Sequence, residues 1–270
     1  MTPHSASATA PAPAADRPRT AFLGVNPVFL GHELRRRFNR QTTVFTLLLP
    51  AVLYLALFRT APSHGSVPHG NFAAWMMIGI AAYGAGMAAT SSAATISIER
   101  SAGWMRTIAL TPLTPPGYLL VKTVSSVLMA AVPVVVVGVL GAATGAEADT
   151  KVWVVSLLTA WLGAAVFAAL GILMGLAMKP DVVMHMPGLM MTALAFLGNL
   201  FIPLSGVMLD ISKFTPMYGV STLARYPLTD GWSFGGEHSS LVGALANTLA
   251  WLAVFSVAAV RRFAKSTGRI

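Results

Sequence analysis

The chain has 270 residues, of which 55% are hydrophobic and only 10% are charged. Because soluble domains contain roughly 25% charged residues, this composition excludes an ordinary soluble protein and indicates an all-α polytopic membrane protein. The formal net charge of +9 would also suit a nucleic-acid-binding protein, but membrane proteins concentrate Lys and Arg in cytoplasmic loops, so we predict membrane lipids and no nucleic acid as partners.

The N-terminal segment precedes all of the long apolar runs. Residues 1–20 are rich in Ala, Pro, Ser and Thr and lack an apolar period, which predicts a disordered cytoplasmic tail. Asn26 followed by Pro27 then signals a helix start. The helix that follows has an apolar face and a basic face, formed by Leu30, Leu34 and Phe38 on one side and by Arg36 and Arg40 on the other. This pattern predicts a helix in the membrane interface, with a cytoplasmic extension of the first span as the alternative.

Six apolar runs are long enough to cross a hydrocarbon core about 30 Å thick, which takes about 20 helical residues. The predicted transmembrane helices cover residues 41–58, 72–98, 117–144, 153–178, 182–204 and 239–260. Together with the interface helix they form one transmembrane domain over 21–265. Most Lys and Arg residues fall in the segments that are cytoplasmic when both termini lie inside, which predicts that orientation.

A charged island from Glu99 to Lys122 separates the second and third predicted spans. Its interior, from Gly103 to Leu110, is long enough for about two helical turns before Pro112, which cannot continue a helix. A short helix between two spans that carries acidic and basic residues must lie at a water-exposed face of the membrane. The predicted orientation places this face in the cytoplasm.

The segment 205–238, between the last two predicted spans, differs from the other loops. It is interrupted by prolines and glycines but keeps many apolar and aromatic residues. It is therefore too polar to span the membrane and too apolar for a solvated loop. We predict short interfacial or re-entrant helices there, with a backbone that the protein buries.

Several kinds of chemistry lack the residues that they need. Apart from Lys122 near the start of the third span, we expect no charged side chain inside the spans, which argues against a proton- or sodium-coupled carrier and an aspartyl intramembrane protease. No glycine precedes a lysine, so the phosphate-binding loop of ATPases is absent. The chain has no cysteine, and His64 and His69, which share one loop, are interpreted as solvated residues, so we predict no metal site.

The charged island resembles the signature of the ABC-2 type transporter permeases, an E-R-x-x-G-x-x-R-x-x-x-x-x-P-L pattern followed by a lysine that enters the third span. The residues that carry the resemblance are Glu99, Arg100, Gly103, Arg106, Leu110, Pro112, Leu113 and Lys122. Trp104 stands where a small polar residue is commoner in the family. The turn Ser205-Gly206, followed by Pro216 and Pro227, looks like the family's extracellular turn and helical hairpin.

The resemblance implies a division of labour between chains. The segment from Gly103 to Leu110 would be a coupling helix that docks, together with its flanking residues, in a separate ATP-binding subunit. That subunit would hold ATP and Mg²⁺, so this chain is expected to carry no cofactor and no enzymatic activity. The alternative is that the charges are solvated interface anchors, which individually contribute little. The family also implies a second permease copy, as a homodimer or a heterodimer.

Within the family, the chain is similar to the bacterial drug-resistance exporters of the daunorubicin-resistance type in its size and in having no fused domain. This similarity implies export of a drug-like or lipid-like substrate across the bacterial plasma membrane. Two alternatives stay open: export of a polysaccharide or lipid-linked glycan by the same machinery, and a membrane-assembly subunit that does not transport.

Overall fold

The computed structural model describes residue 31 and residues 41–60, 66–103, 115–201, 203–232 and 236–267. The structure is mostly helical, which confirms the prediction of an all-α polytopic membrane protein. The predicted tail, the five named residues of the predicted interface helix and residues 104–114 lie outside the described residues.

The first described helices are joined by a small β-hairpin. Helix α2, Gln41–Thr60, covers the first predicted span. Strands β1, Ser66–Val67, and β2, Gly70–Asn71, pair in antiparallel fashion and lead directly into α3, Phe72–Ala94. The side chain of Asn71 accepts a hydrogen bond from the backbone of Ala74 at 2.9 Å and so caps the helix.

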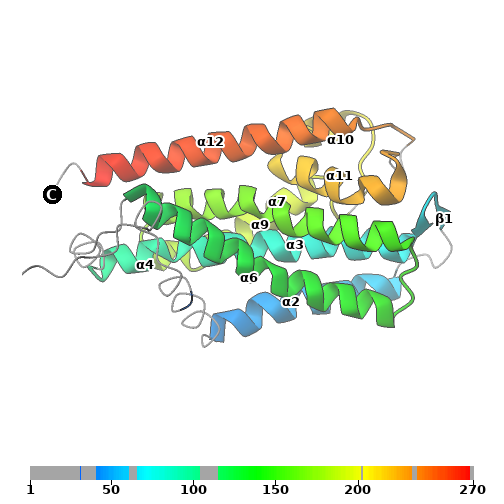
Figure 1. The fold of residues 1–270 in the computed structure, drawn as a ribbon, viewed down its shortest axis with the longest axis horizontal. Helices are drawn as coiled ribbons and strands as arrows, with labels where there is room; N and C mark the ends of the chain where they lie inside the picture. The colour runs from blue at the N-terminus through cyan, green and yellow to red at the C-terminus, as the bar shows by residue number, and fades with distance from the viewer. Residues whose placement is uncertain are drawn as a thin grey trace, which may run out of the picture.

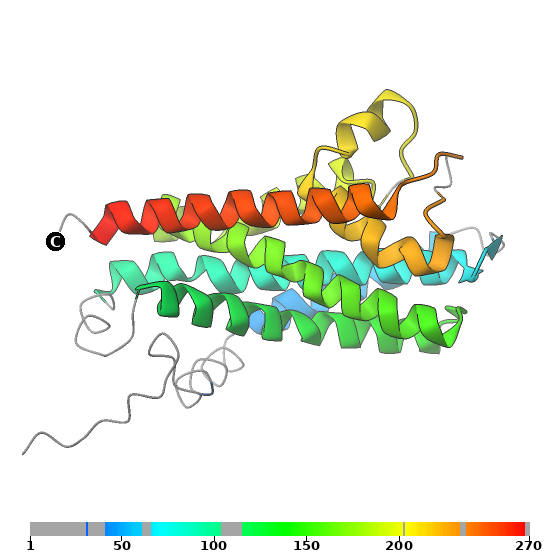
Figure 2. The same ribbon diagram turned by 45° about the horizontal axis from the view of Figure 1, so that its top comes forward.

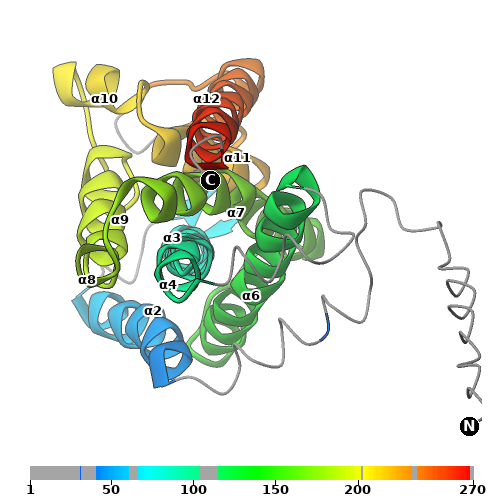
Figure 3. The same ribbon diagram turned by 90° about the vertical axis from the view of Figure 1, so that its left-hand side faces the viewer.

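Helix α3 forms the centre of the bundle. It continues after Thr95 as the short helix α4, Ile96–Ser101. Viewed along its axis, α3 is surrounded by α2, α6, α7 and α9 (Figure 3). The three of these helices not yet described are α6, Pro115–Ala143; α7, Thr150–Ala177; and α9, Met186–Leu197.

The close packing around α3 follows from its composition, since Ala, Gly, Ser and Thr make up most of the helix. Small residues let helices in membranes approach closely. The clearest case is Gly171 of α7, where an added Cβ would lie 2.3 Å from the backbone oxygen of Thr90. Helix α12, Leu241–Thr267, lies outside α7 in the end-on view and is mostly exposed within the described chain (Figure 3).

Four described helical segments are long and apolar enough to cross a membrane: Phe72–Ser101, Gly117–Ala143, Thr150–Ala177 and Leu241–Ala264. They correspond to the second, third, fourth and sixth predicted spans. Within α2 the described residues contain only the shorter apolar stretch Leu48–Leu57. Six spans therefore remain a prediction, as does the location of the termini.

The fifth predicted span differs from a single helix. It is divided into α8, Pro180–Val183, and α9. Pro187 stands in the first turn of α9, where a helix tolerates proline because the missing N–H would have no partner within the helix. The 12 residues of α9 extend only about 18 Å, which is too short to cross the membrane alone.

The segment after α9 forms two short helices, as predicted. These are α10, Val207–Ser212, and α11, Pro216–Thr229, and Figure 2 shows both beside the end of the bundle where α3 begins. Helix α11 is largely buried, whereas α10 is mostly exposed. Their depth in a membrane stays a prediction.

Candidate functional site

The two ends of the bundle carry different groups of polar residues (Figure 1). At one end α4 lies near the start of α6 and the C-terminal end of α12, and we call this the Glu99 end. At the other end the β-hairpin lies near the start of α7, and we call this the His69 end.

Glu99 is held by two residues of α6, and we call these three residues the Glu99 cluster. The ammonium group of Lys122 pairs with Oε1 of Glu99, and the hydroxyl of Tyr118 donates to Oε2 at 2.5 Å. Tyr118 and Lys122 are four residues apart and therefore share one face of α6. All three side chains are buried.

The structure buries this ion pair within two long apolar helical segments. Glu99 lies in Phe72–Ser101, which extends past residue 98, the predicted end of the second span, and Lys122 lies in Gly117–Ala143. Burying one charge alone is costly, but a pair with additional hydrogen bonds offsets much of that cost. The structure thus places the two opposite charges together, away from solvent.

The Glu99 cluster joins several helices. The ring of Tyr118 packs against Phe263 of α12, with 6.3 Å between the ring centroids. Around them lies a small apolar cluster, to which α3, α4, α6, α7 and α12 contribute Ala93, Ile96, Leu119, Ile172, Leu176 and Ala259. Close packing therefore links α4 to α6 and α12.

Helix α4 is also fixed to the end of α7. Nη1 of Arg100 donates to the carbonyl of Leu176 at 2.9 Å, and the hydroxyl of Ser97 donates to the carbonyl of Met178 at 2.7 Å. The last carbonyls of a helix lack partners within the helix and carry partial negative charge, so a guanidinium group suits this position. Glu99 and Arg100 thus bind α4 to α6 and to α7, respectively.

The described chain stops at Gly103 and resumes at Pro115, on either side of the predicted coupling segment. Gly103 has φ of +75°, a conformation that favours glycine, and so forms a sharp turn after α4. The predicted coupling residues beyond it lie outside the described residues: Trp104, Arg106, Leu110, Pro112 and Leu113. The pair of Glu99 and Lys122 therefore joins the two flanks of that segment.

Helices α10 and α11, which cover most of the predicted hairpin, lie away from α4 and nearer the His69 end (Figure 2). Ser205 and Gly206 are exposed before α10, and Gly206 has φ of +57°. Pro216 is the first residue of α11, and its preceding residue, Thr215, accepts a hydrogen bond from the backbone of Tyr218.

Arg225 of α11 is a buried cation. Its guanidinium group donates to the backbone oxygens of Trp75, Asn199 and Leu200 at 3.2, 3.0 and 2.8 Å, and it lies 3.5 Å from the centroid of the Trp75 ring. Gly79 leaves room for it, since an added Cβ would lie 2.0 Å from Nη2. Backbone carbonyls and an aromatic face thus stabilise the cation.

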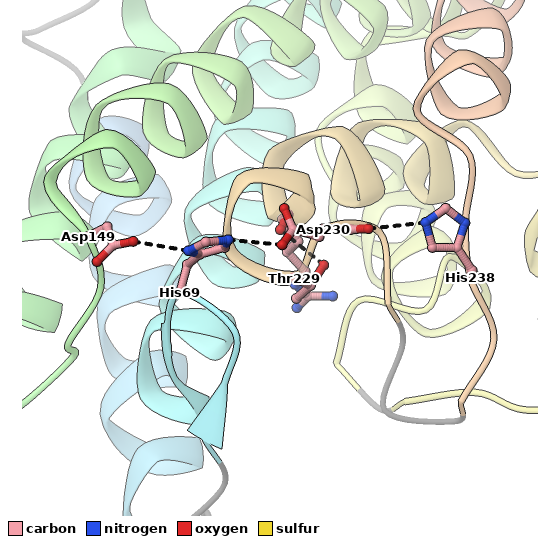
Figure 4. Close-up of polar contacts among 6 residues, drawn as sticks. His69, Asp149, Thr229, Asp230 and His238 are labelled. Atoms are coloured by element: carbon pink, nitrogen blue, oxygen red, sulfur yellow. Dashed lines mark hydrogen bonds and ion pairs between the residues drawn. The ribbon is translucent and has the colours of Figure 1, made fainter.

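His69 is not the simply solvated residue that the sequence indicated. Figure 4 shows its imidazole between the carboxylates of Asp149 and Asp230, and we call these three residues the His69 cluster. The hydrogen bonds that His69 donates to Asp230 and, to a smaller extent, to Asp149 raise the pKa of His69. The part of the chain that the structure describes contains no group of three or more His, Cys, Asp or Glu that could hold a metal ion.

Comparison with known proteins identifies one family. A family model described as ABC-2 type transporter matches residues 30–228, about three quarters of the chain. The match extends from the predicted interface helix into α11 and includes the Glu99 cluster, the coupling segment and His69. No curated protein and no solved structure matches the chain significantly.

Proposed function

Because the chain belongs to the ABC-2 type transporter family, whose members are membrane permeases of ABC-type exporters, we propose that it exports a hydrophobic or amphipathic substrate. Membership in the family implies association with an ABC ATPase subunit. In our proposal this separate subunit binds ATP and Mg²⁺, two copies of the permease pair in a bacterial plasma membrane, and the Glu99 end faces the cytoplasm.

The observation that carries the proposal is the ion pair across the coupling segment. Glu99 and Lys122 stand on opposite flanks of residues 104–114 and are bound to each other. A partner that moves this segment would act on α4 and α6 together, and Arg100 would transmit the movement to α7. Rigid-body shifts of this kind are one of the recurring ways in which proteins convey a conformational change.

An apolar or amphipathic cargo fits the described helices. Helix α9 carries no charged residue, and its side chains Leu189 and Phe196 are 68% and 50% exposed. Exposed apolar side chains on a short, interrupted helix supply a surface that can contact an apolar molecule or lipid chains. Nothing in this surface selects a particular cargo, so the proposal extends to the class of substrate alone.

The proposal predicts that Arg106→Glu uncouples the complex. The variant reverses a charge in the predicted coupling segment, so we expect the ATP-binding subunit to remain bound while substrate-stimulated ATPase activity falls about tenfold or more, which corresponds to at least about 1.4 kcal/mol of activation free energy. The measurement is co-purification of the two subunits followed by ATPase and transport assays in liposomes.

The matched control is Arg262→Glu, which makes the same change at an exposed residue of α12 on the same predicted side of the membrane. This variant should behave like the wild type. If Arg106→Glu assembles, hydrolyses ATP and transports normally, the coupling assignment is wrong.

A further inference from the structure

The His69 cluster brings together three segments that are far apart in the sequence. His69 lies in the turn of the β-hairpin that precedes α3, Asp149 immediately precedes α7, and Asp230 follows α11. The two aspartates are 80 and 161 residues from His69 along the chain. In Figure 4 the imidazole lies between the two carboxylates and connects all three segments.

The geometry of the cluster depends on the protonation of one ring. Nδ1 of His69 lies 3.1 Å from Oδ2 of Asp149, and Nε2 lies 2.9 Å from Oδ2 of Asp230. An ionised carboxylate only accepts hydrogen bonds, whereas a neutral imidazole has a single N–H to donate. Both contacts are therefore hydrogen bonds only when the ring carries two protons. Loss of one proton leaves a ring nitrogen lone pair facing a carboxylate.

The other charged groups near the cluster do not make the contacts that the His69 ring makes with the two carboxylates. The ring of His238 contacts the backbone oxygen of Asp230 at 3.1 Å, not its carboxylate. Glu147 and Lys151 flank Asp149 in the sequence, but within the described residues neither makes a hydrogen bond or an ion pair with His69.

Backbone hydrogen bonds report on whether these segments stay together. The amide of Asp149 donates to the carbonyl of His69 at 3.1 Å, and the amide of His69 donates to the carbonyl of Leu228 at 3.2 Å. Because these bonds do not titrate, loss of a proton from the ring would loosen the segments and not separate them. Opening of the first bond exposes the Asp149 amide to exchange with solvent.

We propose that His69 is a proton-operated clasp. When its ring is doubly protonated, it holds the segments of Asp149 and Asp230 together, and when the ring loses a proton, its contact with one of the two aspartates weakens. The direction of the pKa shift agrees with this geometry, because both carboxylates favour the charged imidazole and raise the pKa of His69 above 6.5. In the orientation of our proposed function the clasp faces the outside of the cell, where acidification would tighten it.

Hydrogen exchange of the Asp149 amide tests the clasp in the full-length chain in detergent or lipid nanodiscs. The wild type is compared with His69→Gln at the same pH, so that the intrinsic pH dependence of exchange cancels. Glutamine cannot take up a proton to reach both carboxylates. We expect exchange to be about two- to fivefold slower in the wild type at pH 6, the range typical of exposed charged pairs, and the ratio to approach one at pH 9.

His238→Gln is the matched control, because it changes the neighbouring imidazole and leaves the His69 cluster intact; it should keep the wild-type pH dependence. Asp230→Asn removes one carboxylate, so protection of the Asp149 amide should change less between pH 6 and pH 9 than in the wild type. This variant provides a second test if His69→Gln does not fold. Two results would overturn the proposal. One is a ratio of exchange rates, wild type to His69→Gln, that stays constant between pH 6 and pH 9. The other is a wild-type pH dependence of Asp149 amide protection in both His69→Gln and Asp230→Asn. The measurement needs neither a substrate nor the ATP-binding subunit, so its failure is distinct from a failure of the proposed function.

Discussion

Individual charged residues are held in this protein in three ways. Glu99 and Lys122 pair in a buried site, Arg225 is surrounded by backbone carbonyls, and His69 bridges two exposed carboxylates. The sequence indicated Glu99 and Lys122 as functional residues, because they belong to one recognisable motif. It could not indicate the environment of His69 or Arg225, because their partners come from distant segments that only the packing of helices brings together.

At this scale we predict strong coupling between Glu99 and Lys122. Lys122→Met removes the cation that contacts Glu99, and loss of one partner of a buried ion pair costs about 3–5 kcal/mol. Glu99→Met should have a similar effect, but the double variant should recover most of the stability, because no charge is then buried in the pair. A double-mutant cycle from chemical unfolding in detergent measures the coupling.

The control for this cycle is Lys151→Met, which removes an exposed lysine at the start of α7 and should change the free energy of unfolding by less than about 1 kcal/mol. Strictly additive effects of Glu99→Met and Lys122→Met would show that the pair contributes no coupling energy.

At the scale of elements, hydrophobicity located the apolar helices but not the interruptions within them. Helix α3 begins at Phe72, where the predicted apolar run begins, and the side chain of Asn71 caps it. The fifth span was predicted as one helix because residues 182–204 are almost uniformly apolar. The helix is interrupted at residues 184–185, between α8 and α9, and again at Asn199, which has φ of +57°, and hydrophobicity predicts neither interruption.

The contact between α3 and α7 provides a prediction at this scale. Gly171→Ala places a Cβ 2.3 Å from the carbonyl oxygen of Thr90, and a backbone atom cannot move aside as a flexible side chain can. We expect a loss of about 1–3 kcal/mol, the usual cost of overpacking, and a lower thermal unfolding midpoint in detergent.

Gly188→Ala in α9 is the comparison variant, because its new Cβ would meet only Met87 Cε at an ordinary 3.4 Å. Alanine should there be neutral or stabilising by up to about 1 kcal/mol. Equal midpoints for the two variants would contradict the role assigned to the close approach at Gly171.

At the scale of the whole molecule, composition was sufficient to predict a helical membrane protein, and the charged island was sufficient to indicate the family that the comparison identifies. The described residues contain four helical segments long enough to cross a membrane, so six spans stay a prediction. Orientation follows from the distribution of Lys and Arg over loops, a statistical rule that needs a direct test.

The absence of cysteine from the sequence makes such a test simple, because single cysteines can be introduced without a background signal. We predict that a membrane-impermeant maleimide labels Thr150→Cys in intact cells, whereas Ser101→Cys is labelled only after lysis. Both positions are exposed, at the His69 end and the Glu99 end respectively. The opposite pattern would invert the proposed topology.

The position of α3 has a mechanical consequence. The 30 residues of Phe72–Ser101 form a rod about 45 Å long, which is fastened near its two tips by the His69 cluster and the Glu99 cluster. Sliding this rod along its axis by one helical turn, about 5.4 Å, would break the contacts at both tips. Tilting or twisting about either tip preserves at least one of them. We therefore expect any large movement of α3 to be a rotation about one tip and not a translation along its axis.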